Sequence, residues 1–289
     1  MAERIDTLLI LGAGGDLTSR LLLPGVASYL GSERGERLTV IGVDRGEVTP
    51  AQWRERVTTA FATENSRLAA SVAKSSIYLQ ADATNPADLA RVLAQAPGRI
   101  AVYFALPPAV TLLAVKALDS LELPKGILFA LEKPFGTDLA TAKSLNRRLQ
   151  KMLPEEQLFR VDHFLGKSTV LNLLGLRFAN RIFEPLFSAP NIERLEITFD
   201  EELALEGRAG YYDRAGALVD MIQSHLLLVL ALVAMEPPAS VDSEDLRGGM
   251  AQVLRATRPW RKNGTSSRRA RYGAGTIDGR RLPAYVDEK

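Results

Sequence analysis

The chain contains only two histidines, and both lie near acidic residues. His163 directly follows Asp162 and is followed by Lys167, while His225 comes five residues after Asp220. An imidazole has an unperturbed pKa of roughly 6.5, so it can accept a proton from a hydroxyl group near neutral pH. A lone histidine is often no more than a packed or surface residue, but acidic neighbours and a nearby lysine favour acid–base chemistry here. His163 and Lys167 also suit an anionic ligand.

Composition indicates a soluble globular protein, and the length permits one large domain or two ordinary ones, of which we favour two. Of 289 residues, 46% are hydrophobic and 24% are charged, and 36 basic against 34 acidic residues leave a net charge of +2. This balance predicts no nucleic-acid partner. A local basic stretch at 258–271 is interpreted as a solvated loop.

The absence of cysteine excludes disulfides and thiol chemistry and fits a reducing compartment. Two distant histidines without a carboxylate cluster predict no metal site. Residues 1–6 do not read as a signal peptide, and the apolar stretch 226–235 is too short to span a bilayer. We therefore expect a cytoplasmic protein with no membrane association.

A short apolar run at 7–11 leads into a glycine turn and then into apolar residues at helical spacing. Glycines at such a turn let the backbone approach a pyrophosphate, which the following helix attracts through its free N–H groups. Leu17 fills the third glycine position of the dinucleotide fingerprint, so the motif alone is a weak signal. The turn residues expected to bind the cofactor are Gly12, Gly14, Gly15, Asp16 and Leu17.

Further apolar runs at 38–43, 77–79, 100–105 and 127–131 alternate with helical patterns. This order predicts an α/β fold, an N-terminal Rossmann-type doubly wound parallel sheet over residues 1–165. Ligands bind at the carboxyl ends of such strands. The loops at that edge add Asp44, Arg45, Leu106, Pro107 and Lys133 to the expected cofactor-binding residues.

The end of the second strand carries conflicting signals about the cofactor. Asp44 would bond the adenosine ribose hydroxyls and repel a 2′-phosphate, whereas the neighbouring Arg45 could pair with that phosphate or remain a solvated charge.

Residues 166–289 are predicted to form an α+β domain, and a resemblance to a known family, carried by the motifs given next, implies that it is a partial substrate and dimerisation domain. Alternation at 192–199 indicates a strand, and helical spacing indicates helices at 215–235 and 240–256, followed by the basic loop and a terminal strand. In an α-helix, Asp220 and His225 would lie about 140° apart around the axis, able to flank a substrate without bonding each other.

Several ordered motifs together resemble the glucose-6-phosphate dehydrogenase family. They are GAGGDL at 12–17, ALPP at 105–108, EKPFG at 132–136, DHFLGK at 162–167, RAGYYD at 208–213 and GALVDMIQSH at 216–225.

The resemblance implies an oxidoreductase of the pentose phosphate pathway that forms 6-phosphogluconolactone from glucose 6-phosphate. His225 would take the C1 hydroxyl proton while hydride leaves C1 for the nicotinamide, and Asp162 would orient His225. The resemblance also implies that His163 and Lys167 hold the phosphate, and that Lys133, Glu201 and Asp220 hold sugar hydroxyls. Lys133 would in addition lie near the nicotinamide. The implied cofactor is NADP, with NAD as the alternative.

Four residues depart from the family pattern. Gly14 replaces a usual serine, Leu21 a lysine, Phe164 a tyrosine and Ser168 a glutamate, and each change removes a group that could bind anion or cofactor. Each lost charge-assisted bond weakens affinity by about tenfold to a hundredfold unless it is compensated.

The chain also stops where the family's second domain continues, as a fragment or as a short natural relative. We expect copies to associate through the edge of a strand at 285–289. Two alternatives remain: a dehydrogenase for another sugar phosphate, and a noncatalytic relative that binds a nucleotide or a partner protein.

Overall fold

The computed structural model describes residues 4–136, 138–202, 204–205, 209–260 and 266–288. It divides into two units, Met1–Val161 and Asp162–Lys289, which are described separately. The division falls before Asp162 rather than after residue 165, so the DHFLGK motif belongs to the second unit. Arg208 of the RAGYYD motif and two residues of the basic stretch, Arg261 and Lys262, lie outside the described residues.

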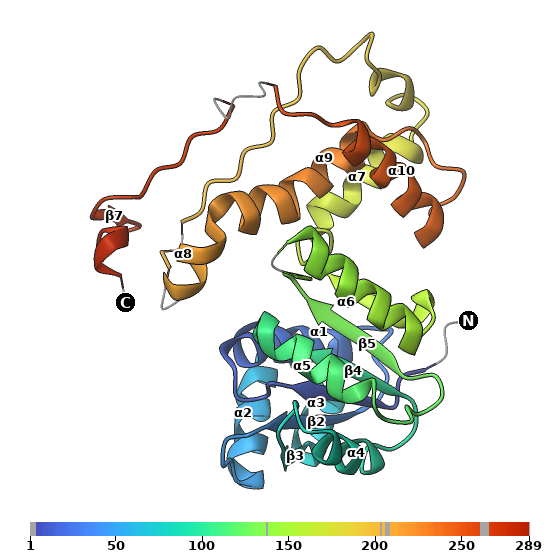
Figure 1. The fold of residues 1–289 in the computed structure, drawn as a ribbon, viewed down its shortest axis with the longest axis vertical. Helices are drawn as coiled ribbons and strands as arrows, with labels where there is room; N and C mark the ends of the chain where they lie inside the picture. The colour runs from blue at the N-terminus through green and yellow to red at the C-terminus, as the bar shows by residue number, and fades with distance from the viewer. Residues whose placement is uncertain (1–3, 137, 203, 206–208, 261–265, 289) are drawn as a thin grey trace. The chain divides into compact units, whose positions relative to one another are not determined.

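The first unit is built on a six-stranded parallel sheet (Figure 1). The strand order is β3-β2-β1-β4-β5-β6, which confirms the predicted doubly wound α/β fold. The strands are β1 Thr7–Leu11, β2 Thr39–Asp44, β3 Ile77–Gln80, β4 Ile100–Phe104, β5 Leu128–Glu132 and β6 Leu158–Val161. Sequence analysis missed β6, because its four residues include Arg160 and give too short an apolar run.

Helices cover both faces of this sheet because side chains along each strand alternate in direction. Ile10 of β1 packs in the core that contains α1 (Leu23–Gly31), α2 (Pro50–Phe61) and α3 (Arg67–Ser75). Leu9 and Leu11 pack in the opposite core, which contains α4 (Pro86–Ala94), α5 (Pro108–Leu118) and α6 (Leu139–Met152). Each such buried side chain contributes about 1.5–3 kcal/mol, so these two cores hold the strand ends in place.

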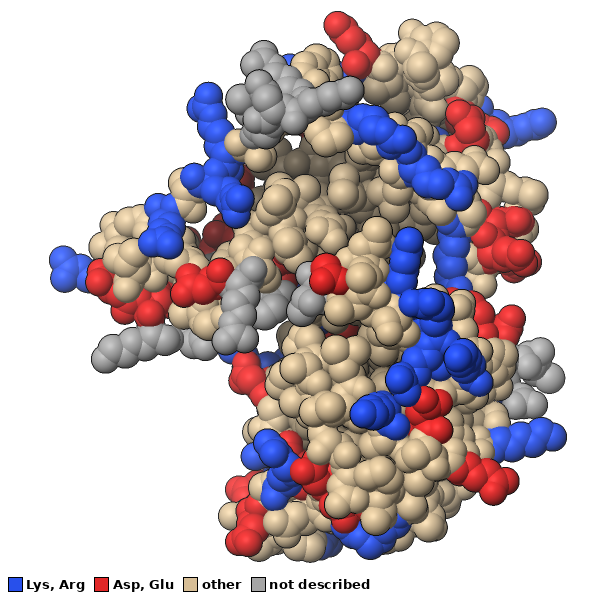
Figure 2. Space-filling model, viewed as in Figure 1, with Lys and Arg blue, Asp and Glu red and all other residues tan. Residues whose placement is uncertain are grey.

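Most of the regular secondary structure among the described residues of the second unit is helical. Its helices are α7 (Ser168–Phe178), α8 (Ala209–Ala217), η4 (Leu218–Leu226), α9 (Leu227–Ala234) and α10 (Ser243–Ala256). A short hairpin joins β7 (Gly275–Ile277) to β8 (Arg280–Leu282), and single 3-10 turns lie at Glu184–Leu186 (η3) and Tyr285–Asp287 (η5). Figure 2 shows acidic and basic side chains intermixed over the face in view, in keeping with the small net charge.

Two strands predicted in this unit are wrong. Residues 194–202 have no regular secondary structure, and the segment near the end of the chain forms the η5 turn instead of a strand. Alternating side chains make a strand feasible, but a strand also needs a partner for its backbone N–H and C=O groups, and the alternation does not supply one.

The predicted helix at 215–235 is present, but it is not one regular α-helix. Gly216 breaks it with φ 64° and ψ 169°, and η4 is a nine-residue π-helix. The segment Ala215–Ala234 has the length and composition to cross a membrane, although core helices of soluble proteins meet the same criterion. Asp220 and His225 lie within it, and such groups are costly in hydrocarbon. A cytoplasmic location stays a prediction.

Arg177 on α7 forms hydrogen bonds with the carboxyl end of α9. The side chain is 3% exposed, and its Nη1 and Nη2 donate to the carbonyls of Leu232 and Met235 at 2.7 and 2.8 Å. Burial lowers the pKa of Arg177, and the charge of Glu236 opposes that shift. The cation meets the negative end of the helix dipole. These two hydrogen bonds hold α7 and α9 together. Lys167 directly precedes α7, and His225 lies just before the start of α9.

We expect Arg177→Met to lower the free energy of unfolding by about 1–3 kcal/mol, because two buried carbonyls lose their donors. Chemical denaturation of the full chain measures the change. The control is Arg255→Met, an exposed arginine in the last turn of α10. Equal losses in both variants would contradict the role assigned to Arg177.

Candidate active site

The glycine turn after β1 is packed so closely that only glycine fits at its first position. Gly12 has φ +91°, and a Cβ there would lie 2.1 Å from the carbonyl oxygen of Ala105. The N–H groups of Gly12 and Ala13 donate to the Val43 carbonyl at 2.9 and 3.0 Å. The turn is therefore held against the ends of β2 and β4, which is the arrangement that lets a backbone approach a pyrophosphate.

A cavity of about 180 Å³ opens beside this turn at the carboxyl ends of the strands. The residues that line it are Gly12, Gly15, Val43, Asp44, Arg45, Ala81, Asp82, Ala83, Ala105, Leu106, Pro107 and Val110. Six of the expected cofactor-binding residues are among them. Gly14, Asp16, Leu17 and Lys133 are not. A larger hollow of about 630 Å³ lies along α6 and contains none of the predicted site residues.

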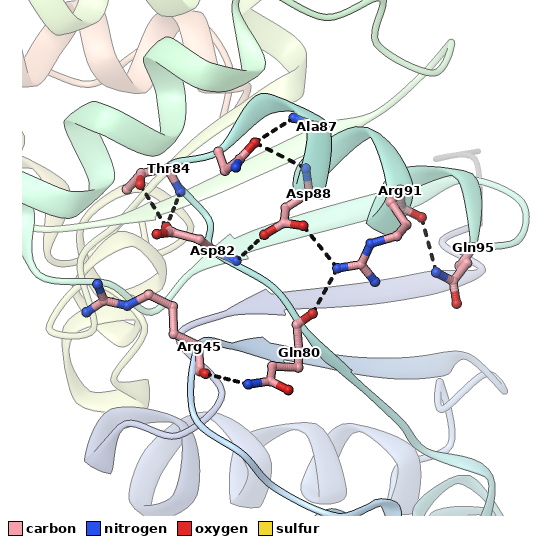
Figure 3. A network of polar contacts seen from close by, with 9 residues as sticks. Arg45, Gln80, Asp82, Thr84, Ala87, Asp88, Arg91 and Gln95 are labelled. Carbon is pink, nitrogen blue, oxygen red and sulfur yellow. Dashed lines mark hydrogen bonds and ion pairs between the residues drawn. The ribbon is translucent and has the colours of Figure 1, made fainter.

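The Asp44 carboxylate is held by backbone donors around the turn. Its Oδ2 accepts from the N–H of Gly14 at 2.9 Å, and its Oδ1 accepts from the N–H of Arg45 at 2.7 Å and of Gly46 at 3.3 Å. The Arg45 carbonyl accepts from the side-chain amide of Gln80 (Figure 3). The Asp44 carboxylate therefore has a fixed position at the end of β2.

Other residues of the motif lie on the surface. Asp16 forms an exposed ion pair with Arg20 at 3.2 Å, and Leu21 is 66% exposed. Leu17 precedes the short π-helical turn Thr18–Leu22 (η1) as its N-cap.

Lys133 follows the last residue of β5, and its peptide bond to Pro134 is cis. Sequence analysis missed Tyr103 of β4, whose hydroxyl donates to the carboxylate of Glu132, next to Lys133. Burial raises the pKa of Tyr103, and the bond to Glu132 and its negative charge raise it further. The phenol thus stays a neutral donor that holds the start of the EKPFG turn. Its place on β4 was the available signal, because adjacent strands present neighbouring side chains to each other.

In the second unit, the structure brings His225 and Asp162 into contact. The Nδ1 of His225 lies 2.6 Å from Oδ1 of Asp162, and the two side chains are 0% and 10% exposed. Since a carboxylate only accepts hydrogen bonds, Nδ1 carries the hydrogen and Nε2 is the nitrogen able to take a proton. The same Oδ1 accepts from the N–H of Phe164 at 2.9 Å, which fixes the carboxylate. A general base and the group that orients it need a contact of this kind.

Aromatic rings hold the His225 imidazole from its faces. The Phe164 ring stacks on it with 4.2 Å between centroids and 16° between planes, and the His163 ring lies 4.6 Å away. The Nζ of Lys167 lies over two phenylalanine rings, 4.2 Å from the Phe164 centroid and 5.5 Å from the Phe199 centroid. Sequence analysis considered Phe164 only as a lost hydroxyl and missed this packing role.

The π-helix changes the relation between Asp220 and His225. Hydrogen bonds in a π-helix join residues five apart, so such residues lie closer together around the axis than in an α-helix. The predicted separation of 140° is therefore wrong, because it assumed α-helical geometry. Both side chains are buried, at 8% and 0% exposed. Glu201, by contrast, is exposed in the segment without regular structure.

Two family models match the chain and together cover nearly all of it. Residues 9–172 match the glucose-6-phosphate dehydrogenase NAD binding domain, and residues 174–289 match the C-terminal domain of the same enzyme. The chain belongs to the glucose-6-phosphate dehydrogenase family.

Relatives and solved structures of this family agree with the assignment. Glucose-6-phosphate 1-dehydrogenase of Bacillus subtilis is 36% identical over 97% of this chain and 60% of its own length. The enzyme of Zymomonas mobilis is 35% identical over 100% and 62%. A solved glucose-6-phosphate dehydrogenase in complex with its substrate glucose 6-phosphate matches with a TM-score of 0.83 and 28% identity, over 100% of this chain and 63% of that one. The chain thus spans about 60% of the length of these curated relatives.

Proposed function

We propose that the chain oxidises C1 of glucose 6-phosphate to 6-phosphogluconolactone, with NADP or NAD as the hydride acceptor. The observation that carries this proposal is the buried pair of Asp162 and His225. Membership of the glucose-6-phosphate dehydrogenase family supports the reaction, and so does the relative solved in complex with glucose 6-phosphate.

In this proposal His225 is the general base. Its Nε2 takes the proton of the C1 hydroxyl, and the Asp162 carboxylate stabilises the imidazolium that forms. The stacked Phe164 ring and the bond at Nδ1 restrict the imidazole to one orientation. Such positioning supplies much of the rate in an enzyme, because the reacting groups need no further ordering. The nicotinamide supplies the hydride-accepting carbon when it is bound.

His163 and Lys167 are proposed to bind the phosphate of the substrate, as two donors close to the base. Lys133, Glu201 and Asp220 are proposed to bind sugar hydroxyls. Phe164 has no hydroxyl to offer the phosphate, so we expect weak affinity for phosphate esters at this point.

The cofactor is proposed to bind in the first unit. The tightly packed glycine turn and the cavity beside it support a nucleotide site here. The residues proposed to hold it are Gly12, Gly14, Gly15, Asp16, Leu17, Asp44, Arg45, Leu106, Pro107 and Lys133.

The test is the absorbance of reduced nicotinamide, measured with the full chain and glucose 6-phosphate, with NAD and NADP in separate reactions. We expect absorbance to rise only when sugar and nucleotide are both present. Other hexose and pentose phosphates serve as controls for substrate choice. Nucleotide binding by calorimetry without turnover of any sugar phosphate would contradict the proposal and favour a noncatalytic relative.

A further inference from the structure

We propose that the Asp44 carboxylate makes NAD the preferred nucleotide of this chain, and that the missing side chain of Gly14 leaves space for this carboxylate. The inference rests on the proposed function only in that a nicotinamide nucleotide binds at the glycine turn. It selects between the two cofactors that the sequence left open.

Asp44 ends β2, the strand whose last residue faces the adenosine ribose in dinucleotide-binding folds. Three backbone N–H groups fix its carboxylate, two on Oδ1 and one on Oδ2. A carboxylate has about four acceptor sites, so Oδ2 retains capacity for a ribose hydroxyl. The 2′-hydroxyl of NAD can donate to this oxygen, whereas a 2′-phosphate offers only negative charge.

Gly14 and Asp44 form a matched pair. A Cβ on Gly14 would lie 2.9 Å from Oδ2 of Asp44, closer than real Cβ contacts allow. Serine at this position would therefore push the carboxylate away from the turn. The glycine that departs from the family pattern thus allows the Asp44 carboxylate to lie against the turn and accept from the N–H of Gly14.

The charges around the cavity also oppose a 2′-phosphate. Asp44 and Asp82 line it together with Arg45. The N–H and hydroxyl of Thr84 donate to Asp82 at 2.8 and 2.7 Å and lower its pKa, so it stays ionised at neutral pH. The charge of the Arg45 guanidinium lowers that pKa a little further, and Figure 3 shows both side chains at this edge of the sheet. Two of the three charged residues that line the cavity are therefore negative.

The test is the affinity of the full chain for NAD and for NADP, measured by calorimetry without sugar. We expect NAD to bind roughly tenfold more tightly or better, because placing like charges together is costly. Asp44→Ala should lose most of this preference, and Gly14→Ser combined with Asp44→Ala should favour NADP. Glu47→Gln is the control, since Glu47 is an exposed carboxylate three residues away that does not line the cavity.

Tighter binding of NADP by the unaltered chain would overturn the inference, and so would an unchanged ratio in Asp44→Ala. Arg45→Ala supplies a further criterion. A selective loss of NADP affinity in this variant would show that Arg45, and not Asp44, is the residue that contacts the adenosine ribose and its 2′-phosphate. Binding of neither nucleotide also contradicts the inference. Because these measurements need no turnover, a failed dehydrogenase assay leaves them readable.

Discussion

Replacing His225 by alanine will lower kcat by roughly 10²-fold or more, the usual contribution of a general base. The imidazole is fully buried and bonded to Asp162, so its loss removes the proton acceptor together with the stacking contact on Phe164. The measurement is steady-state formation of reduced nicotinamide from glucose 6-phosphate by the full chain. Circular dichroism of the same sample establishes that the variant is folded.

A second substitution separates catalysis from packing. His225→Asn keeps a side-chain N–H able to donate to Asp162 but offers no basic nitrogen, so it should lose as much kcat as alanine while unfolding at a temperature nearer to that of the unaltered chain. The other histidine provides a matched control. His163→Ala should raise KM for the sugar phosphate more than it lowers kcat. Normal kcat in both His225 variants would remove the residue from the mechanism.

Asp162→Asn should lower kcat by roughly 10²-fold or more, through the tautomer of the imidazole. An amide N–H in place of the carboxylate oxygen would donate to Nδ1 and leave the hydrogen on Nε2, the atom that must accept the substrate proton. Because the same Oδ1 faces both Nδ1 of His225 and the N–H of Phe164, an amide nitrogen in its place would also lose the bond from Phe164.

Steady-state kinetics across sugar concentrations will show whether the loss lies in kcat, as expected for a residue that acts through His225. Asp200→Asn is the control, because Asp200 is an exposed carboxylate of the same unit. A KM effect with unchanged kcat in Asp162→Asn would assign that carboxylate to substrate binding and leave His225 without an orienting partner.

Local patterns in the sequence determined much of the first unit. Strands buried on both faces are continuous apolar runs, and the helices between them have apolar residues at regular spacing, so β1 to β5 could be placed from neighbouring residues alone. The glycine turn was readable for the same reason, since its backbone needs glycine locally. The short strand β6 was missed because four residues with an arginine carry too little of that pattern.

The second unit was harder to predict because its structure depends on distant partners. The alternating residues at 192–199 lack a paired strand, and no local pattern predicts the π-helix that contains Asp220 and His225.

The sequence by itself determined the fold class and named the groups able to do chemistry, because both depend on residue type and short spacing. Only the tertiary structure decided which of them meet. Asp162 and His225 are 63 residues apart, and so their 2.6 Å contact depends on the packing of the whole unit. The choice between Asp44 and Arg45 was open for the same reason, because Asp44 ends β2 and Arg45 is the next residue. Only the structure shows that the N–H of Gly14, across the turn, donates to the Asp44 carboxylate.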